Sequence, residues 1–209
     1  FCQLFFAESI ASSSHDHEID VVNIQELDPT ILVDLRYSSK NNFLKKDMYG
    51  DLEECLLRKK PAEMLCQANK PLKVSHPELR LLVFDGLRTR SVQKELWDAL
   101  DTFPISIRTQ FVAASKKGSI HNYSTAVDLT LALENGSELD MGTKYDHFEE
   151  LTFPALEDSL LDLGKLTNKG IENKGILRKK TTKTCFSTIG SEWCHLVSFL
   201  YNETVYNKI

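Results

Sequence analysis

Three residues of this sequence have side chains suited to hold a metal ion together: His121, Asp128 and His195. A catalytic zinc ion takes about three protein ligands, usually imidazole nitrogen or carboxylate oxygen, and keeps one position open for water. Two neutral imidazoles and one carboxylate leave such a site positively charged, which lowers the pKa of a bound water towards neutrality. The set therefore predicts hydrolysis by an activated water. Each residue alone also fits an ordinary hydrogen-bonded structural role, so the spacing leaves both interpretations open.

Glu192 and Arg88 could complete such a site. Hydrolysis of a peptide needs a carboxylate that takes the proton of the water and passes it to the leaving amine, and Glu192 lies shortly before His195. Residues three apart in an ideal strand point to opposite faces, so we expect Glu192 at a turn or bulge. Arg88 follows an apolar run, residues 81–84, and could stabilise an oxyanion. Taken alone, it would be a surface ion-pair partner.

The strand expected to carry Asp128 is the clearest element. Residues 126–131 alternate strictly between two faces. The apolar face would present Val127, Leu129 and Leu131, and the polar face Asp128 and Thr130. Asn135-Gly136 then predicts a hairpin turn into a short return strand, residues 138–141. His121 would lie at the end of a loop, so that the intervening residues fold back and bring both ligands to one ion.

The other expected elements do not alternate regularly. Further strands are predicted over residues 31–37, 81–84 and 193–199. Helices are predicted from Pro61, from an N-cap at Ser91 to Leu100, over residues 154–163 with Gly164 closing the end, and before Cys185. At 209 residues the chain fits one domain. We therefore predict a single-domain α+β fold, in which helices flank a central, mostly antiparallel sheet.

Composition narrows the classes of partner. The formal charge of −5 argues against nucleic acid or an anionic membrane surface as the main partner. No segment after the N-terminal residues is long and apolar enough to predict a transmembrane helix. The five cysteines are odd in number and include no C-x-x-C pair, which argues against a disulfide framework or a cysteine-rich zinc cluster but leaves one disulfide open. The sequence carries no signal for an oligomeric state.

The N-terminal residues predict export. Residues 1–7 are apolar and are followed by small and hydroxyl-bearing residues with a small-x-small site ending at Ala11, which is typical of the end of a secretory signal. An N-terminal strand is the alternative. We expect residues 1–18 to be a signal remnant or a disordered lead-in, and residues 19–209 to form the catalytic domain. The expected location is the periplasm or another exported site, with the cytoplasm as the alternative.

Five ordered motifs resemble those of the D-alanyl-D-alanine dipeptidases, the zinc peptidases related to the vancomycin-resistance dipeptidase. In chain order they are Asp34-Leu35-Arg36-Tyr37 with Asn42-Phe43, Asp85-Gly86-Leu87-Arg88, Ser119-x-His121 followed by residues 126–131, Asp140-Met141-Gly142-Thr143 with Asp146, and Glu192-Trp193-x-His195. The resemblance spans residues 31 to 197. Because the motifs occur together and in order, they are much more specific than any one of them.

The resemblance implies one zinc ion per chain, held by His121, Asp128 and His195. It implies Glu192 as the general base and Arg88 as the group that stabilises the transition state. Three side chains are implied around a bound dipeptide: Tyr37, Ser119 and Asp146. Asp146 would face the free ammonium group of the substrate, since a closed dipeptide pocket must pair that charge. The implied substrate is D-Ala-D-Ala from peptidoglycan, a small peptide.

This chain departs from the family pattern at four positions. Ser124 replaces the usual Gly, and serine costs more than glycine if the position requires φ > 0. Cys194 replaces the second Trp of the Glu-Trp-Trp-His motif, and strand alternation would point it away from His195. Leu87 and Thr89 replace the common Tyr and Pro around Arg88. All ligands and the base are kept, so the departures bear on substrate preference.

Two other functions stay open at this point. A related D,D- or L,D-carboxypeptidase would trim longer muropeptides with the same residues. A metal-binding protein without catalysis would only recognise wall peptides. Glu192 and Arg88 favour an enzyme, since a site that had lost catalysis would be free to lose them.

Overall fold

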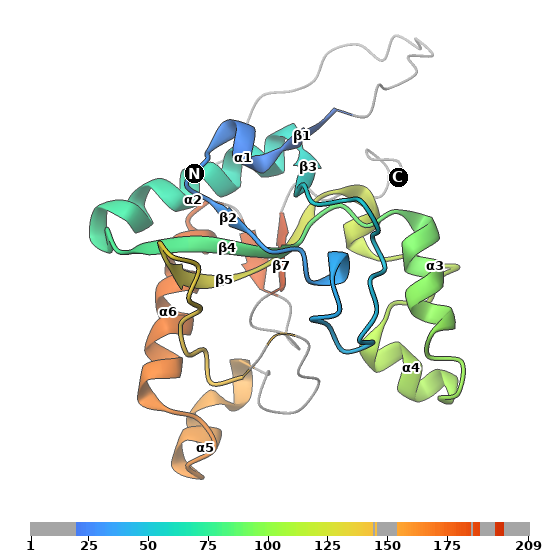
Figure 1. The fold of residues 1–209 in the computed structure, drawn as a ribbon. Coiled ribbons are helices and arrows are strands. Elements are labelled where there is room, and N and C mark those ends of the chain that lie inside the picture. The colour runs from blue at the N-terminus through green and yellow to red at the C-terminus, as the bar shows by residue number, and fades with distance from the viewer. Residues whose placement is uncertain (1–19, 144, 146–153, 185, 189–194, 199–209) are drawn as a thin grey trace, which may run out of the picture.

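The computed structural model describes residues 20–143, 145, 154–184, 186–188 and 195–198, whose main element is a five-stranded sheet (Figure 1). Its strands follow the order β2 (Leu32–Val33), β4 (Leu79–Asp85), β5 (Ala126–Leu133), β7 (His195–Ser198) and β6 (Phe186–Thr188). Neighbouring strands are antiparallel except β2 and β4. A second, two-stranded sheet pairs β1 (Val21–Asn23) with β3 (Leu56–Arg58).

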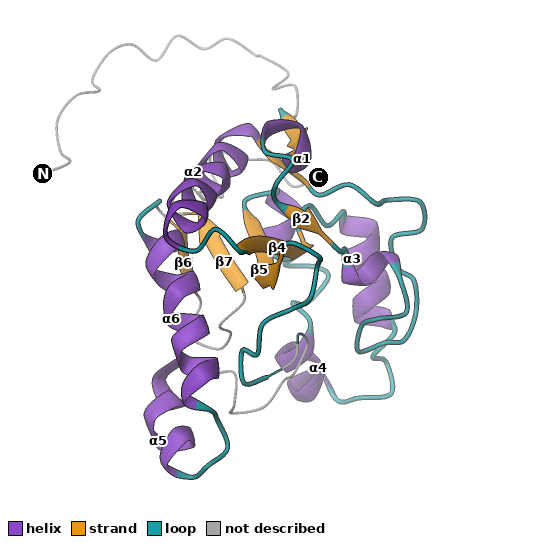
Figure 2. Ribbon diagram, turned by 60° about the vertical axis from the view of Figure 1, so that its left-hand side comes forward, coloured by secondary structure: helices purple, strands orange, loops and turns teal. Residues whose placement is uncertain are grey.

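Helices flank the large sheet, which confirms the predicted α+β class. The α-helices are α1 (Ile24–Leu27), α2 (Lys59–Ser75), α3 (Arg90–Asp98), α4 (Ile105–Phe111), α5 (Glu157–Asp162) and α6 (Asn168–Thr182). The 3-10 helices are η1 (Arg36–Ser38), η2 (Ile120–Tyr123) and η4 (Pro154–Leu156). Helices α2 and α6 lie together beside the sheet, whereas α3 and α4 lie on the other side of the molecule (Figures 1 and 2).

The two faces of the sheet differ as the alternation of β5 predicted. The main core joins one face to α2 and α6, and Val127, Leu129 and Leu131 are fully buried in it. The other face carries a smaller apolar cluster of Leu82, Phe84 and Ala132. Because side chains of a strand alternate between faces, Asp128 lies on this second face, away from α2 and α6.

The predicted strand over residues 31–37 is shorter than expected. Only Leu32 and Val33 pair with β4, and the Asp34 N–H then donates to the Val83 carbonyl at 2.9 Å. The chain turns from there into η1, where the Tyr37 carbonyl accepts the N–H groups of two later residues, 48 and 49. Tyr37 is buried in a separate apolar cluster rather than on the sheet, because the loop of residues 39–52 folds over it.

Two other predicted boundaries are corrected. Helix α3 is capped by Thr89, not by Ser91, because Thr89 has the extended backbone of an N-cap and its hydroxyl accepts the Val92 N–H. The turn at Gly136 forms with φ of +85°, but the return segment makes a single bridge, Ala132 to Glu138, and no strand. The predicted helix over residues 154–163 forms as η4 and α5.

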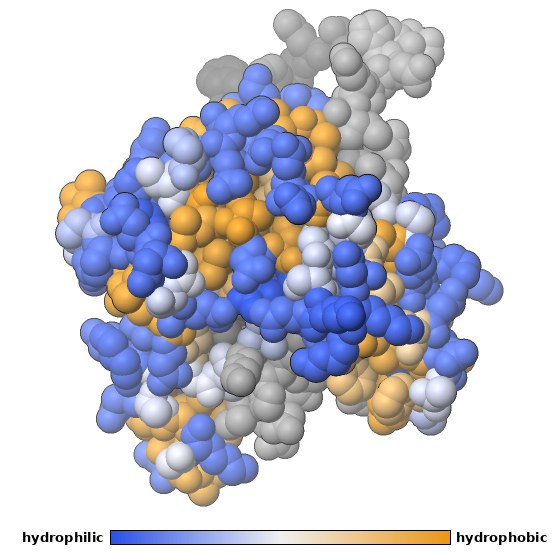
Figure 3. Space-filling model, in the orientation of Figure 1, coloured by the Kyte–Doolittle hydropathy of each residue, from blue (hydrophilic) through white to orange (hydrophobic). Residues whose placement is uncertain are grey.

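The surface and the cysteines add little to the site. None of the described helices is long and apolar enough to cross a membrane. Figure 3 shows hydrophilic side chains over much of the view, with apolar side chains in its upper centre and near α4, where Phe103, Ile105 and Ile107 are exposed. Cys55 and Cys66 are free thiols, and the other three cysteines lie outside the described residues. Residues 1–18 also lie outside, so export stays a prediction.

Candidate active site

Two of the three predicted metal ligands lie opposite each other on neighbouring strands. Asp128 of β5 pairs in register with His195 of β7. Asp85, the last residue of β4, is the register partner of Asp128 on its other side. Directly opposed residues of antiparallel strands share a face of the sheet. The sheet therefore sets two carboxylates and one imidazole in a row across three strands.

His121 reaches this row from η2, the short helix that leads into β5. The Ser119 hydroxyl accepts the His121 N–H at 3.3 Å, and the Asn122 side chain accepts the Ser119 N–H at 2.7 Å. These two reciprocal bonds form a capping box at the N-terminus of the helix. The chain then reverses at Ser124, with φ 58° and ψ 34°, before it enters β5. This loop is the predicted fold-back between the first two ligands.

Two of the three separations between the ligand atoms of these residues are close to those of a zinc site. His121 Nε2 is 3.2 Å from His195 Nδ1, and Asp128 Oδ1 is 2.7 Å from His195 Nδ1 and 3.6 Å from His121 Nε2. Tetrahedral zinc, with bonds of about 2.0–2.2 Å, separates its ligand atoms by about 3.3–3.5 Å. The shortest separation here is that of a hydrogen bond. All three side chains are buried, so the donor set fits a buried zinc ion.

The second nitrogen of His121 fixes how its ring is used. His121 Nδ1 lies 2.7 Å from the Gly86 carbonyl oxygen, which can only accept, so Nδ1 carries the proton and Nε2 presents its lone pair to the other ligands. There is no room for a side chain at Gly86, because a Cβ there would lie 2.8 Å from Cys55 Sγ and 3.1 Å from the Leu56 carbonyl oxygen. Glycine is therefore required for this carbonyl to reach His121.

Asp128 is held in its charged form. Burial alone would raise the pKa of its carboxyl group, but the charges and hydrogen bonds of His121 and His195 lower the pKa well below its usual value. Its second oxygen, Oδ2, accepts the Tyr145 hydroxyl at 3.0 Å. The carboxylate thus meets the imidazoles with one oxygen and a tyrosine with the other.

Arg88 is buried beside this set and is not a surface ion-pair partner. It is 7% exposed, and its guanidinium forms an ion pair with Asp85 and donates to Gln93 Oε1 at 3.2 Å. The ring of Tyr37 lies 5.0 Å from its Cζ. Burial would lower the pKa of Arg88, but Asp85 and the nearby tyrosines, Tyr49 first, raise it well above its usual value. A permanent positive charge is therefore fixed here.

Asp85 connects the arginine to the predicted metal ligands. Its Oδ1 accepts the Tyr49 hydroxyl at 2.5 Å and the Gly86 N–H at 2.9 Å, while its Oδ2 pairs with Arg88. The same Oδ2 lies 3.7 Å from His121 Nδ1. Burial and Asp85 together raise the pKa of Tyr49 well above its usual value, so Tyr49 remains a donor. One buried carboxylate therefore faces both Arg88 and the predicted metal ligand His121.

Hydrogen bonds of the backbone also connect the Arg88 segment to the His121 segment. The Arg88 N–H donates to the His121 carbonyl at 3.2 Å, and the Asn122 amide donates to the Arg88 carbonyl at 2.7 Å. These bonds hold the segment after β4 against η2. The motif of residues 85–88 and that of residues 119–121 are thus parts of one site, as their resemblance implied.

The residues predicted to bind substrate are only partly described. Tyr37 lies against Arg88, and Ser119 lies at the start of η2, where its oxygen accepts the His121 N–H and its own hydrogen is left for another partner. The predicted base Glu192 and the predicted ammonium partner Asp146 lie outside the described residues.

The departures from the family pattern have different consequences. Ser124 does adopt φ > 0, and its hydroxyl donates to the Leu56 carbonyl at 3.2 Å. Leu87 is buried, and its N–H donates to the same carbonyl at 2.9 Å. Thr89 caps α3, so the helix after Arg88 keeps a defined start without proline. Cys194 lies outside the described residues.

Four side chains of the site had no predicted role: Asp85, Gln93, Tyr49 and Tyr145. Asp85 could have been found, because it ends an apolar strand within the same motif as Arg88. Gln93 is on α3, and nothing in its sequence neighbourhood distinguishes it from other polar helix residues. The two tyrosines come from loops, and their hydroxyl partners are distant in sequence.

Comparison with known proteins agrees with the geometry. The family described as D-ala-D-ala dipeptidase matches residues 17–208. A D-alanyl-D-alanine dipeptidase of Escherichia coli (strain K12) is 29% identical over 176 residues, which make up 84% of this chain and 83% of that protein.

Two solved structures show weaker similarity. The vancomycin-resistance D,D-pentapeptidase VanY of a VanB-type resistance cassette, in complex with Zn(II), matches with a TM-score of 0.42 and 13% identity, over 69% of this chain and 73% of that chain. The LD-carboxypeptidase LdcB matches with a TM-score of 0.45 and 19% identity, over 86% of this chain and 67% of that chain. The family match over nearly the whole chain decides the assignment: this protein belongs to the D-Ala-D-Ala dipeptidase family of peptidases.

Proposed function

We propose that this protein is a zinc-dependent dipeptidase that hydrolyses D-Ala-D-Ala to two molecules of D-alanine. The observation that carries the proposal is the convergence of His121, Asp128 and His195 next to the buried guanidinium of Arg88. The family match and the dipeptidase of E. coli support the choice of substrate. Peptidoglycan, which contains D-Ala-D-Ala, would be the source of the dipeptide.

The three ligand residues would hold one zinc ion through His121 Nε2, Asp128 Oδ1 and His195 Nδ1. Bound zinc supplies Lewis-acid activation of water in such sites. The chain contributes a closed ligand set: the Gly86 carbonyl fixes the ring of His121, and the low pKa of Asp128 keeps its carboxylate charged. The first feature leaves the lone pair of His121 Nε2 available for a cation, and the second keeps a negative charge on Asp128.

Arg88 would stabilise the negative charge that develops on the carbonyl oxygen of the scissile bond. A fixed donor contributes most where water is excluded, because the effective dielectric constant is low there. Arg88 meets this condition, since it is buried and oriented by Asp85 and Gln93. Two of its five N–H donors are used in these contacts, which leaves others for a substrate oxygen.

The remaining roles follow from the sequence motifs. Glu192 would act as the general base that takes the proton of the attacking water and delivers it to the leaving amine. Asp146 would pair with the free ammonium group of the dipeptide, and Tyr37 and Ser119 would line the bound substrate. In this proposal residues 19–209 form the catalytic domain.

The test compares free D-Ala-D-Ala with its N-acetylated form in an assay for released D-alanine, before and after treatment with a chelator. We expect cleavage of the free dipeptide only, loss of activity with the chelator and recovery with added zinc. Acetylation removes the charge that Asp146 would attract, and an unpaired buried carboxylate costs about 1–3 kcal/mol or more. Equal or better cleavage of the acetylated compound would replace the dipeptidase by a carboxypeptidase. Zinc binding without any turnover would leave a wall-peptide binding protein.

A further inference from the structure

The two oxygens of Asp128 have different partners. Oδ1 faces the imidazoles, at 2.7 Å from His195 Nδ1 and 3.6 Å from His121 Nε2. Oδ2 accepts the hydroxyl hydrogen of Tyr145 at 3.0 Å. A carboxylate can bind a metal ion through one oxygen or through both, and a hydrogen bond on one oxygen favours binding through the other. The hydrogen bond from Tyr145 therefore affects whether Asp128 would bind a metal ion through one oxygen or through both.

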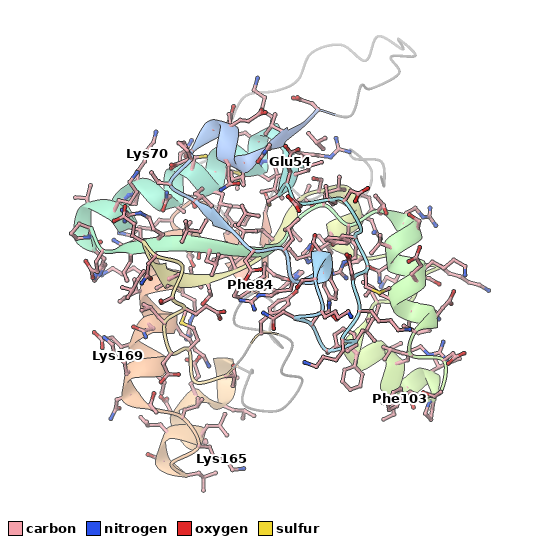
Figure 4. All side chains as sticks on the ribbon, viewed as in Figure 1. Glu54, Lys70, Phe84, Phe103, Lys165 and Lys169 are labelled. Carbon is pink, nitrogen blue, oxygen red and sulfur yellow. The ribbon has the colours of Figure 1, made fainter. Side chains whose placement is uncertain are left out.

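The ring of Tyr145 is anchored independently of its hydroxyl. It packs on the ring of Phe84, with 4.9 Å between centroids and 48° between planes, and it joins the apolar cluster on the second face of the sheet. Phe84 lies near the end of β4, beside η1 (Figure 4). On η1, Arg36 places its guanidinium carbon 4.2 Å from the centroid of the Phe84 ring.

Arg36 is itself fixed. It is 6% exposed, and its guanidinium pairs with Asp34 at 3.2 Å and with Glu138. A stack of three side chains, Arg36, Phe84 and Tyr145, thus leads from the N-terminal motif to the metal-ligand carboxylate. Removal of the hydroxyl alone would leave the apolar part of this stack in place.

We propose that Tyr145 is a positioning residue for Asp128: its hydroxyl holds Oδ2 and leaves Oδ1 as the single ligand atom. The inference rests on the proposed zinc site. Hydrogen-bond partners of ligating side chains fix their orientation, and loss of such a partner weakens metal binding by about 10–100-fold. Tyr145 acts here through Asp128 and needs no contact with substrate.

The experiment measures the zinc affinity of Tyr145→Phe by competition with a chromogenic chelator. We expect binding about tenfold weaker than in the parent protein. The control is Thr30→Val, which removes a hydroxyl from a carboxylate outside the site, that of Asp28, where the hydroxyl donates to Oδ1 at 2.6 Å. The control should bind zinc as tightly as the parent. Thermal unfolding of both variants without metal shows whether they remain folded.

The outcomes separate this inference from the proposed function. Parental zinc affinity in Tyr145→Phe would overturn the inference, and so would equal losses in both variants, which would mark a general effect of lost hydroxyls. A protein that binds zinc with the expected pattern but does not cleave D-Ala-D-Ala would overturn the function and keep the inference. A parent that binds no zinc would overturn both.

Discussion

The candidate site has two halves that are built differently. The metal half consists of His121, Asp128 and His195, and two of its members are paired residues of adjacent strands. The arginine half consists of Arg88 and the side chains around it: Asp85, Gln93, Tyr37 and Tyr49. The first half is placed largely by the backbone hydrogen bonds of a sheet, and the second largely by contacts between side chains.

This difference decides how each half should respond to substitution. A strand register is shared by many hydrogen bonds, so no single side chain determines where the backbones of Asp128 and His195 lie. The direction of the Arg88 guanidinium depends on two acceptors, Asp85 and Gln93. Loss of a partner of a buried charged group costs about 1–3 kcal/mol or more. We therefore expect the metal half to lose its function completely only at its ligands, with a smaller loss of zinc affinity at Tyr145, and the arginine half to be sensitive at several positions.

The largest expected effect is at a metal ligand. His195→Ala should abolish both zinc binding and hydrolysis, because two ligands cannot replace the usual three protein ligands of a catalytic zinc. Metal content by atomic emission and released D-alanine measure the two losses. His76→Ala, a change of the same kind outside the site, is the control. Full activity in metal-free His195→Ala would remove the metal half altogether.

The next effect is at the centre of the arginine half. Arg88→Lys keeps one positive charge but loses the planar fork that reaches Asp85 and Gln93 together. We expect kcat to fall by about 10²–10³-fold, as for loss of an oxyanion donor, while zinc content stays that of the parent. Loss of zinc in this variant would contradict the separation of the two halves.

A smaller effect is expected at Gln93, which is fully buried on α3 and donates to the Ala113 carbonyl at 2.7 Å. That bond turns its oxygen towards Arg88. Gln93→Leu removes the acceptor, so the guanidinium of Arg88 loses part of its orientation. We expect kcat for release of D-alanine to fall about tenfold, which corresponds to a loss of about 1.4 kcal/mol in the stabilisation of the transition state.

The double variant with Arg88→Lys is the control for Gln93. If Gln93 acts through the guanidinium, its substitution should change little once Arg88 is lost, because residues in one network are not additive. Additive losses would assign Gln93 a purely structural role in α3.

The sequence predicted the metal half much better than the arginine half. Asp128 lies in a strictly alternating strand, so its face could be predicted locally, and the motifs indicated the two histidines that the structure brings beside it. Gln93 and Tyr145 matter only through partners that the fold brings close, and no local pattern marks such contacts. The same limit explains Tyr37, whose predicted strand gives way to η1 because a later loop supplies its backbone partners.

The elements themselves show a similar division. Strands β4 and β5 and helix α2 follow from apolar periodicity, and the structure confirms them. The N-cap of α3 was wrong by two positions, because Thr89 and Ser91 are equally good caps in sequence and their hydroxyls lie 2.8 Å apart in the structure. The extended backbone at Thr89, whose hydroxyl accepts the Val92 N–H, decides between them.

The smallest expected effect tests the loop within the metal half that brings His121 back to Asp128, at Ser124. Its left-handed backbone costs a residue with a Cβ about 1–2 kcal/mol relative to glycine, whereas its hydroxyl bond to the Leu56 carbonyl contributes about 0.5–1.5 kcal/mol. Ser124→Gly relieves the backbone strain but loses the hydroxyl bond, so its free energy of unfolding should stay near that of the parent. Ser124→Ala loses the bond and keeps the strain, so it should be less stable than Ser124→Gly by about 1 kcal/mol. Urea unfolding of the three proteins, each without zinc, measures the difference. Equal stability of the alanine and glycine variants would show that this loop does not hold φ > 0 in solution, and the fold-back that brings His121 to Asp128 would need another explanation.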